Sequence, residues 1–500
     1  MLYQSTRNAA KKVNAAEAIV KGISEDGGLF VPCEIPHISL EDIKSLSEKN
    51  YRDRAKTILG LYLTDFTGEE LDKCVTNAYN SKSFGSDAIA PLHHLNDTAS
   101  ILELWHGPTC AFKDMALQIL PHFMTCSIKK RKIDREIVIL VATSGDTGKA
   151  ALEGFADVEG TRILVFFPEN GVSEIQKLQM LTQEGKNVGV ASVCGNFDDA
   201  QTGVKRIFGD SEFNAVLEEN GFRLSSANSI NWGRLVPQIV YYFSAYCDMV
   251  NSGKVAVGDK INICVPTGNF GNILAAWYAK EMGLPVNKFI CASNANNVLT
   301  DFINTGIYDK NREFKTTTSP SMDILISSNL ERLLFDITGR NEKLIKDWMN
   351  KLSSCGKYEV SDTEKEIIKS NFYGGYCNDD DTKETIKSIW NEYKYLMDTH
   401  TAVGYNVYKQ YTDKTGDKTP AVIASTANPY KFNETVLNAV SPGINTKLMN
   451  EFDVLYALNE KTGLEIPYSL AELKDKAKRF DTKCEKENMI NVVREMLGIR

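Results

Sequence analysis

The stretch Trp105-His-Gly-Pro-Thr-Cys-Ala-Phe-Lys-Asp-Met-Ala-Leu-Gln118 decides how the rest of this chain is interpreted. The apolar residues just before it predict a buried strand, and Met115 to Ile128 has the pattern of a helix. Lys113 therefore lies where a loop enters a helix, among apolar side chains. Such surroundings desolvate the ammonium, so the pKa falls and the free amine can form a Schiff base with a carbonyl. The alternative is a lysine whose stem packs on apolar surface while its charge reaches solvent.

Composition limits the class of protein. The chain has 500 residues, 43% of them hydrophobic, which is enough for large cores and more than one domain. The net charge of −8 comes from interspersed acids and bases, which argues against nucleic acid or an anionic membrane as partner. The 11 cysteines include no Cys-x-x-Cys pair, so neither a disulfide framework nor a zinc site is indicated. Without a run of about 18 apolar residues, we expect a cytoplasmic protein with no membrane span or signal peptide.

Strand-like runs alternate with helical patterns from about residue 98 onward. We predict strands at 137–142, 162–167, 187–193, 261–265, 289–292 and 421–424, with helices such as 173–184, 197–209 and 235–250. This alternation predicts an α/β fold in which helices cover parallel sheets, and the number of strands indicates two sheets. Residues 1–95 instead show helical patterns at 14–21 and 39–83, which predicts an α-rich N-terminal unit.

Three turns rich in glycine, serine and asparagine follow predicted strands. They are Ala142-Thr-Ser-Gly-Asp-Thr-Gly148, Pro266-Thr-Gly-Asn-Phe-Gly-Asn272 and Ala424-Ser-Thr-Ala-Asn-Pro-Tyr-Lys-Phe432. In the second, glycines let the backbone approach an anion and helix-start amides point at it, which is typical of a phosphate cradle. A plain tight turn is the alternative. The first turn matches a nucleotide P-loop poorly, because Thr143 replaces its first glycine and Ala150 its Ser or Thr.

Together with the lysine segment, these turns resemble the signature of pyridoxal-phosphate enzymes of the tryptophan-synthase β type, fold type II. The lysine segment and Leu224-Ser-Ser-Ala-Asn-Ser-Ile-Asn-Trp-Gly-Arg234 resemble the threonine synthase family in particular, as do residues 3–7, 25–32 and 395–404. The resemblance implies two parallel-sheet, three-layer domains with an α-rich N-terminal extension. The implied boundaries are 1–95 for the N-terminal domain, 131–235 for a small mobile domain, and 96–130 with 236–500 for a large cofactor-binding domain with helical elaboration at about 300–400.

The resemblance also assigns the cofactor and its ligands. It implies that pyridoxal 5'-phosphate is held covalently by Lys113, with the ring nitrogen facing the Thr426 hydroxyl and the ring oxygen near Asp146. Relatives of this fold often have Asn at the latter position, so the role of Asp146 is less defined than its place. The implied phosphate loop consists of Gly268, Asn269, Phe270, Gly271 and Asn272.

The substrate contacts come from the same resemblance. It implies a carboxylate site at Thr143 and Ser144. It further implies a clamp for a substrate phosphate, formed by Thr147, Asn228, Ser229 and Arg234. An arginine suits this role because its forked guanidinium makes charge-assisted contacts to phosphate oxygens. The structural alternative for Arg234 is an ion pair with a nearby carboxylate.

The implied activity is that of a lyase acting on phosphate, which converts O-phospho-L-homoserine and water into L-threonine and phosphate. A phospho-lyase or amino-acid dehydratase on the same fold is one alternative. A non-catalytic ligand-binding relative is another, but its hallmark would be loss of the lysine or the clamp, and the chain retains both. We expect a small-molecule substrate and a monomer or homodimer.

Two features are interpreted as structural. His106, within a Trp-His-Gly-Pro turn, is expected to be a hydrogen-bonded structural histidine, and the neighbouring Cys110 a small packing residue. The run Asn378-Asp-Asp-Asp-Thr382 lacks the Gly and distal Glu of a calcium loop. We therefore expect it to cap a helix that begins near Thr382, and we expect no metal.

Overall fold

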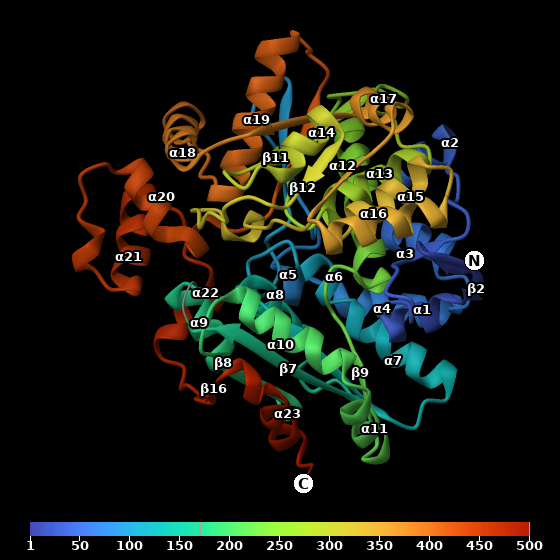
Figure 1. Cartoon of the computed structure of the whole chain (residues 1–500). Coiled ribbons are helices and arrows are strands. Elements are labelled where there is room, and N and C mark those ends of the chain that lie inside the picture. The colour runs from blue at the N-terminus through green and yellow to red at the C-terminus, as the bar shows by residue number, and fades with distance from the viewer. Residues whose placement is uncertain (170–171, 500) are drawn as a thin grey trace.

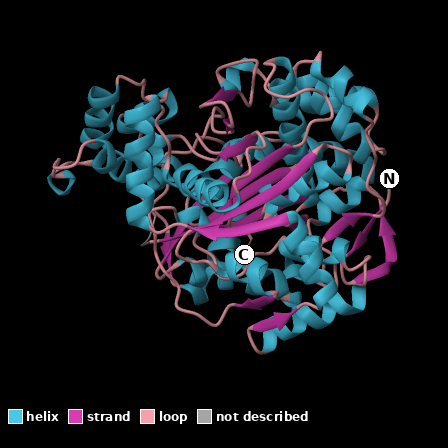
Figure 2. Cartoon of the chain, turned by 90° about the horizontal axis from the view of Figure 1, so that it is seen from above, coloured by secondary structure: helices cyan, strands magenta, loops and turns pink. Residues whose placement is uncertain are grey.

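The computed structural model describes residues 1–169 and 172–499 and has an α/β architecture with two main sheets (Figure 1). The larger sheet has six strands in the order β14-β11-β10-β15-β5-β4, and every neighbouring pair is parallel except β4 with β5. Its strands are β4 (Leu92–His94), β5 (Ala99–Glu103), β10 (Ile261–Pro266), β11 (Val286–Ser293), β14 (Phe372–Tyr376) and β15 (Ala421–Ser425). Figure 2 shows this sheet from above, enclosed by helices.

The smaller sheet has five parallel strands in the order β16-β8-β7-β6-β9. They are β6 (Glu136–Ala142), β7 (Thr161–Pro168), β8 (Val188–Val193), β9 (Phe222–Ser225) and β16 (Lys483–Cys484). Its helices are α8 (Asp146–Phe155), α9 (Glu174–Leu181), α10 (Phe197–Gly209) and α11 (Ser211–Glu219). A C-terminal helix, α23 (Met489–Leu497), packs on the same core. The end of the chain thus returns to the smaller sheet. The predicted boundaries instead place it in the large domain, and these boundaries remain a prediction.

The N-terminal unit combines a small antiparallel sheet with helices. Its strands, in the order β2-β1-β3, are β1 (Tyr3–Ser5), β2 (Asn8–Val13) and β3 (Phe30–Pro32). Its helices are α1 (Ala15–Lys21), α2 (Leu40–Ser47), α3 (Tyr51–Tyr62), α4 (Gly68–Ala78) and α5 (Ser81–Phe84). Side chains of Asn14, Ser39, Asn50 and Thr67 cap the N-termini of the first four, which explains why these helices begin where they do.

The helices of the large unit surround a central helix, α12 (Trp232–Asn251), which is buried along nearly its whole length. It packs against α13 (Gly271–Glu281), α3 and α2. The region 300–400 is the expected helical elaboration, with a small hairpin of β12 (Ile307–Asp309) and β13 (Lys357–Glu359). The remaining α-helices are α14 (Val298–Thr305), α15 (Leu330–Ile337), α16 (Glu342–Ser354), α17 (Asp362–Asn371), α18 (Asp379–Tyr393), α19 (Thr399–Thr415), α20 (Asn433–Val440), α21 (Glu451–Thr462) and α22 (Tyr468–Ala471).

All six strands that were predicted by residue range are confirmed, with ends that differ by a few residues. One predicted helix is wrong, because the structure has two helices where one continuous helix was expected. Met115 to Ile128 forms two helices, α6 (Asp114–Leu117) and α7 (Leu120–Arg131), because Pro121 lies in the first turn of the second. The capping role of Asn378 is confirmed, since its side chain accepts a hydrogen bond from Asp381 N at 2.8 Å. That helix, α18, begins at Asp379 rather than near Thr382.

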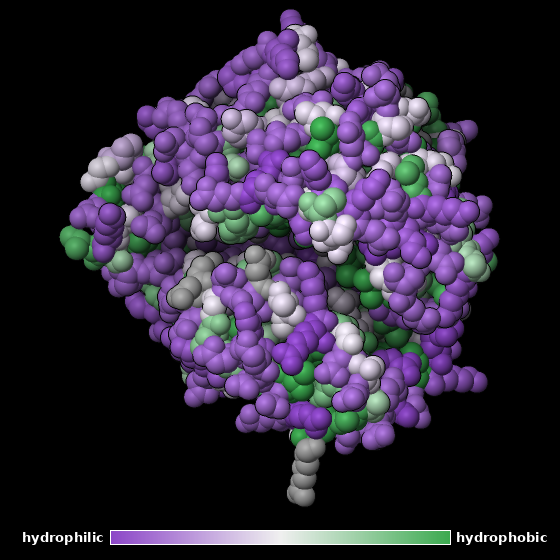
Figure 3. Space-filling view, in the orientation of Figure 1, coloured by the Kyte–Doolittle hydropathy of each residue, from purple (hydrophilic) through white to green (hydrophobic). Residues whose placement is uncertain are grey.

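The two sheets lie in separate parts of the molecule, and the surface is hollowed between them (Figure 3). Because strands β5, β15, β10 and β11 are parallel neighbours, the loops that follow them meet at one edge of the larger sheet. Within residues 1–169 and 172–499, every helix is too short or too polar to cross a membrane.

Candidate active site

The lysine loop and the turn after β15 are joined by backbone hydrogen bonds. Phe112 N donates to Thr426 O at 2.8 Å, and Asn428 N donates to Cys110 O at 3.0 Å. Cys110 has a left-handed backbone (φ 59), which turns the loop sharply before Lys113. These two bonds form an isolated antiparallel bridge between Ala111 and Ala427, which lies beyond the end of the parallel β5–β15 pair and holds the lysine loop against the turn after β15.

Lys113 is buried at the point where the two units meet. Its Nζ lies 3.2 Å from Ser321 Oγ and 3.5 Å from Asp146 Oδ2. Burial lowers the pKa of Lys113; the attraction of Asp146 opposes this effect, and repulsion from Arg234 and Lys431 adds to it. The amine is therefore easier to deprotonate than an exposed lysine, as the sequence predicted.

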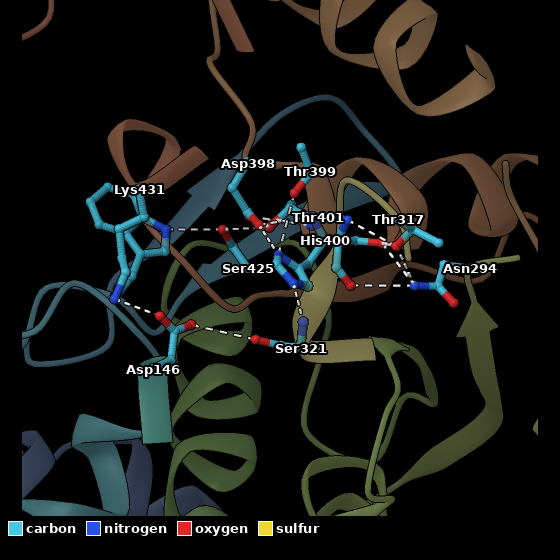
Figure 4. A network of polar contacts seen from close by, with 12 residues as sticks. Asp146, Asn294, Thr317, Ser321, Asp398, Thr399, His400, Thr401, Ser425 and Lys431 are labelled. Atoms are coloured by element: carbon cyan, nitrogen blue, oxygen red, sulfur yellow. Dashed lines mark hydrogen bonds and ion pairs between the residues drawn. The ribbon is translucent and has the colours of Figure 1, made fainter. Parts of the chain in front are cut away.

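Asp146 begins helix α8 and forms the shortest ion pair of the site with a second lysine. Its Oδ1 lies 2.7 Å from Lys431 Nζ (Figure 4). The same oxygen accepts from Gln176 Nε2 at 2.8 Å. Burial alone would raise the pKa of Asp146, but the charges of Lys431 and Lys113 hold it well below the usual range. Lys431 Nζ also donates to Thr109 O at 2.9 Å. Asp146 is therefore held as a carboxylate beside the amine.

The turn after β10 has the geometry of an anion cradle. Its carbonyls face away from the helix start, because Gly268 O accepts from Ser327 Oγ at 2.7 Å and Asn269 O accepts from Asn329 Nδ2 at 3.0 Å. Phe270 has φ 62 and precedes α13, whose first amides have no acceptor within the helix. A Cβ on Gly268 would lie 2.6 Å from Ser321 O, so a larger residue does not fit there.

The turn after β6 is tightly closed by its own side chain. Thr143 Oγ1 accepts from Gly145 N at 3.0 Å and from Gly148 N at 2.8 Å. Gly145 has φ 141, and a Cβ there would lie 2.5 Å from the Gln176 side chain. The Thr143 hydroxyl thus shapes the turn, while Ser144 is partly exposed and free to contact a ligand.

The predicted phosphate clamp gathers around the start of α12. Arg234 is buried, its Nη1 donates to Ala227 O at 2.8 Å, and burial lowers its pKa to about 10. No carboxylate lies within ion-pair distance of this guanidinium in the described ranges, which disfavours the structural alternative. Asn228 and Ser229 are half-buried just before this helix, and Ser229 Cβ is 3.9 Å from the position of a Cβ on Gly271. Thr147 is half-buried in the first turn of α8, and its place in the clamp stays a prediction.

Three other residues have clear environments. The Thr426 hydroxyl, on a buried residue, forms no hydrogen bond with the described part of the chain. His106 Nε2 lies 2.7 Å from Glu103 Oε2 and its ring stacks on Trp105, in agreement with a structural role. Cys110 Sγ lies 3.4 Å from Ser469 Oγ.

These features fit a phosphorylated carbonyl cofactor. Lys113 supplies a buried amine, and the Gly268 turn leaves room for an anion against the backbone. Asn272 Nδ2 is a buried donor without a partner among the described residues, although its Oδ1 accepts from Tyr241 OH at 2.6 Å. An unpaired buried donor is costly, so a bound anion would satisfy it.

Comparisons with known proteins agree with this chemistry. The model described as "Threonine synthase N terminus" matches residues 2–79, "Pyridoxal-phosphate dependent enzyme" matches 90–426, and "Threonine synthase, C-terminal" matches 401–494. The chain is 38% identical to threonine synthase from Pseudomonas aeruginosa over 440 residues, which is 88% of this chain and 90% of that protein. This chain belongs to the threonine synthase family of pyridoxal-phosphate-dependent enzymes.

Solved structures of the threonine synthase family have the same fold. Pyridoxal-phosphate-bound threonine synthase from Brucella melitensis superposes with a TM-score of 0.87 at 36% identity, covering 99% of this chain and 98% of that one. The yeast threonine synthase structure gives a TM-score of 0.88 at 34% identity, covering 99% of both. The predicted α/β architecture of fold type II and the dependence on pyridoxal phosphate are confirmed.

A further group of family members is longer. Threonine synthase-like 1 from Homo sapiens is 44% identical over 444 residues, which is 86% of this chain but 59% of that protein. The chain thus spans about three fifths of the length of these curated relatives.

The structure adds residues that sequence reasoning missed. Lys431 belongs to the turn after β15, but no role was predicted for it. Its neighbours Pro429, Tyr430 and Phe432 nevertheless give it the same apolar setting as Lys113. That setting was the available signal. Ser321 and His400 lie in segments that resemble the family, 319–325 and 395–404, but neither received a role, because their contacts join distant parts of the chain.

Proposed function

We propose that this chain is a threonine synthase, which converts O-phospho-L-homoserine and water into L-threonine and phosphate. The observation that carries the proposal is the pairing of one buried amine, Lys113, with two separate anion-binding regions. One is the neutral cradle from Gly268 to Asn272, and the other is the charged clamp around Arg234. A phosphorylated cofactor and a phosphorylated substrate need two such regions.

The charges of the site suit two anions. Arg234 and Lys431 are buried cations, whereas Asp146 is the acid that both flanking lysines face. The acid is matched by Lys431, which leaves the charge of Arg234 uncompensated. Such a buried, unmatched guanidinium attracts the phosphate of a substrate and stabilises the charge that grows as phosphate departs.

Lys113 is the proposed proton acceptor and donor. The reaction removes protons from Cα and then Cβ, expels phosphate from Cγ, protonates Cγ, adds the hydroxyl of water at Cβ and returns a proton to Cα. Pyridoxal phosphate, when bound, supplies the electron sink for the negative charge left at Cα. The lowered pKa of Lys113 leaves its Nζ able to accept these protons and return them.

The remaining residues orient the reactants. The free hydroxyl of Thr426 is the proposed partner of the ring nitrogen, which a hydroxyl can contact without holding it protonated as a carboxylate would. Ser144, Thr147 and the turn amides are the proposed contacts of the substrate carboxylate and phosphate. Closure of the two units over the substrate is the proposed means of excluding water.

Product analysis tests this proposal. The purified protein with pyridoxal phosphate is incubated with O-phospho-L-homoserine, and phosphate, amino acids and 2-oxo acids are measured together. We expect one threonine for each phosphate and no oxo acid. Release of a 2-oxo acid and ammonia with phosphate would replace the proposal by a phospho-lyase, and no phosphate release would contradict both.

A further inference from the structure

Ser321 contacts the amine of Lys113 from a segment without an assigned role. It lies in the 3₁₀ turn η1 (Pro320–Met322), and its Oγ is 3.2 Å from Lys113 Nζ. The same Oγ donates to Asp146 Oδ2 at 3.4 Å. Its carbonyl lies against Gly268, at 2.6 Å from the position of a Cβ there. Ser321 thus joins the amine, the carboxylate and the cradle.

A buried histidine and aspartate hold the backbone of this serine. Ser321 N donates to His400 Nε2 at 3.1 Å (Figure 4). Because a backbone N–H can only donate, Nε2 accepts, and the ring proton resides on Nδ1. Nδ1 lies 2.8 Å from Asp398 Oδ1, which accepts that proton's hydrogen bond. Asp398 Oδ2 in turn accepts from Thr401 N at 3.2 Å.

Packing alone does not account for this arrangement. The same segment is already anchored on either side of Ser321: Thr318 Oγ1 donates to Asp379 Oδ1 at 2.9 Å, and Asp323 Oδ1 accepts from Asn294 Nδ2 at 2.7 Å. The His400–Asp398 pair is almost completely buried and is directed at Ser321, whose hydroxyl contacts Lys113. A buried ionisable pair is costly to maintain, so its direction points to the site.

We propose that the Ser321 hydroxyl is a further catalytic group of this site, which stabilises the protonated form of Lys113, and that His400 and Asp398 position it. The proposal rests on Lys113 being the reacting amine of the proposed function. An ammonium donates a stronger hydrogen bond than an amine, and the Ser321 hydroxyl can accept it while donating to Asp146. The proton that Lys113 takes from the substrate stays on Nζ until it is returned, so Ser321 forms and breaks no covalent bond.

The test uses the holoenzyme and compares Ser321→Ala with two changes at His400. The absorption of the bound cofactor is titrated from pH 5 to 10, and kcat and KM are measured separately. The charged groups that face Lys113, namely Asp146 of α8, Arg234 of α12 and Lys431, are the same in every variant. Ser321→Ala removes an acceptor from the protonated nitrogen, so its midpoint should move to lower pH by about one unit. We expect kcat to fall about tenfold or more, with KM changed less.

The His400 variants separate positioning from packing. His400→Leu removes the acceptor of Ser321 N and should reproduce the shift. His400→Gln retains an acceptor and should restore the midpoint. Asp379→Ala loosens the same segment without touching Ser321 and should leave the midpoint unchanged. If His400→Leu does not fold, Ser321→Ala still decides the proposal.

Two results would overturn the inference. One is a Ser321→Ala holoenzyme with the midpoint and kcat of the wild type. The other is an equal shift in Asp379→Ala, which would reduce Ser321 to a packing residue. The titration needs no substrate, so a protein that makes no threonine but shows the shift fails the proposed function while this inference stands.

Discussion

Removing the guanidinium of Arg234 should separate the two anion sites. Arg234→Ala takes away a buried cation that has no carboxylate partner in the described ranges and whose pKa burial lowers to about 10. The variant should keep pyridoxal phosphate, because the cradle is built from Gly268 to Asn272. It should lose affinity for O-phospho-L-homoserine and inorganic phosphate.

The magnitude follows from the bonds lost. A hydrogen bond to a charged group contributes about 1.5–3 kcal/mol. At about 1.4 kcal/mol per decade, that is roughly a 10- to 100-fold loss of affinity. At a phosphate concentration ten times the wild-type Kd, phosphate stabilises the wild type by about 1.4 kcal/mol. A tenfold weaker site reduces that gain to about 0.4 kcal/mol under the same conditions.

Calorimetric titration and thermal unfolding with and without phosphate measure this change. Arg223→Ala is the matched control, because Arg223 is exposed on β9 and pairs with Glu218 at 2.6 Å. L-homoserine serves as the unphosphorylated ligand and should bind both variants as it binds the wild type. The reasoning is refuted if Arg234→Ala loses the cofactor, or if it weakens phosphorylated and unphosphorylated ligands equally.

Three further changes probe the cradle, the buried ion pair and the protein's pH response. Gly268→Ala should weaken the binding of pyridoxal phosphate at least tenfold in an absorbance titration, because the new Cβ would lie 2.6 Å from Ser321 O. Gly68→Ala is the control, since the space around Gly68 is open. Equal affinities of the two variants would contradict the cradle. Lys431→Met should lower the free energy of unfolding in urea by about 3–5 kcal/mol, because Asp146 loses its nearest cation. Adding Asp146→Asn should restore part of that stability, and a double variant with no restored stability would contradict this account. Burial raises the pKa of Asp336 to about 7, so unfolding releases a proton between about pH 4 and 7 and stability falls as pH rises. Asp336→Asn should lack that slope, at most about 1.4 kcal/mol per pH unit, and matching pH profiles would refute it.

Hydrophobic patterning predicted the sheets well but not their edges. Strand β14 was not predicted, because its two central glycines, Gly374 and Gly375, weaken the strand pattern. The structure explains them: a Cβ on Gly374 would lie 3.1 Å from the Ile303 side chain, so helix α14 packs too closely for a larger residue. Strand β16 has two residues, which is too short to show the alternation of apolar and polar residues. It is recognised as a strand only by its pairing with β8.

The candidate site was predictable where it follows strands. Loops after β5, β10 and β15 converge because parallel strands of one sheet place their carboxyl ends together, and the loop after β6 of the smaller sheet meets them through Asp146. Lys431 and Ser321 take their places in the site through tertiary contacts with Asp146 and Lys113, and His400 does so through Ser321; no local spacing encodes these contacts. Charge pairing across the chain therefore had to be read from the structure.

The central claim is that Lys113, rather than another buried lysine, carries the cofactor. Lys431 is the rival, since it is fully buried and lies 2.7 Å from the same carboxylate. The most direct measurement is borohydride reduction of the holoenzyme followed by peptide mapping of the pyridoxyl group. Our account predicts a single modified peptide that contains Lys113, and modification of Lys431 or any other lysine would contradict it.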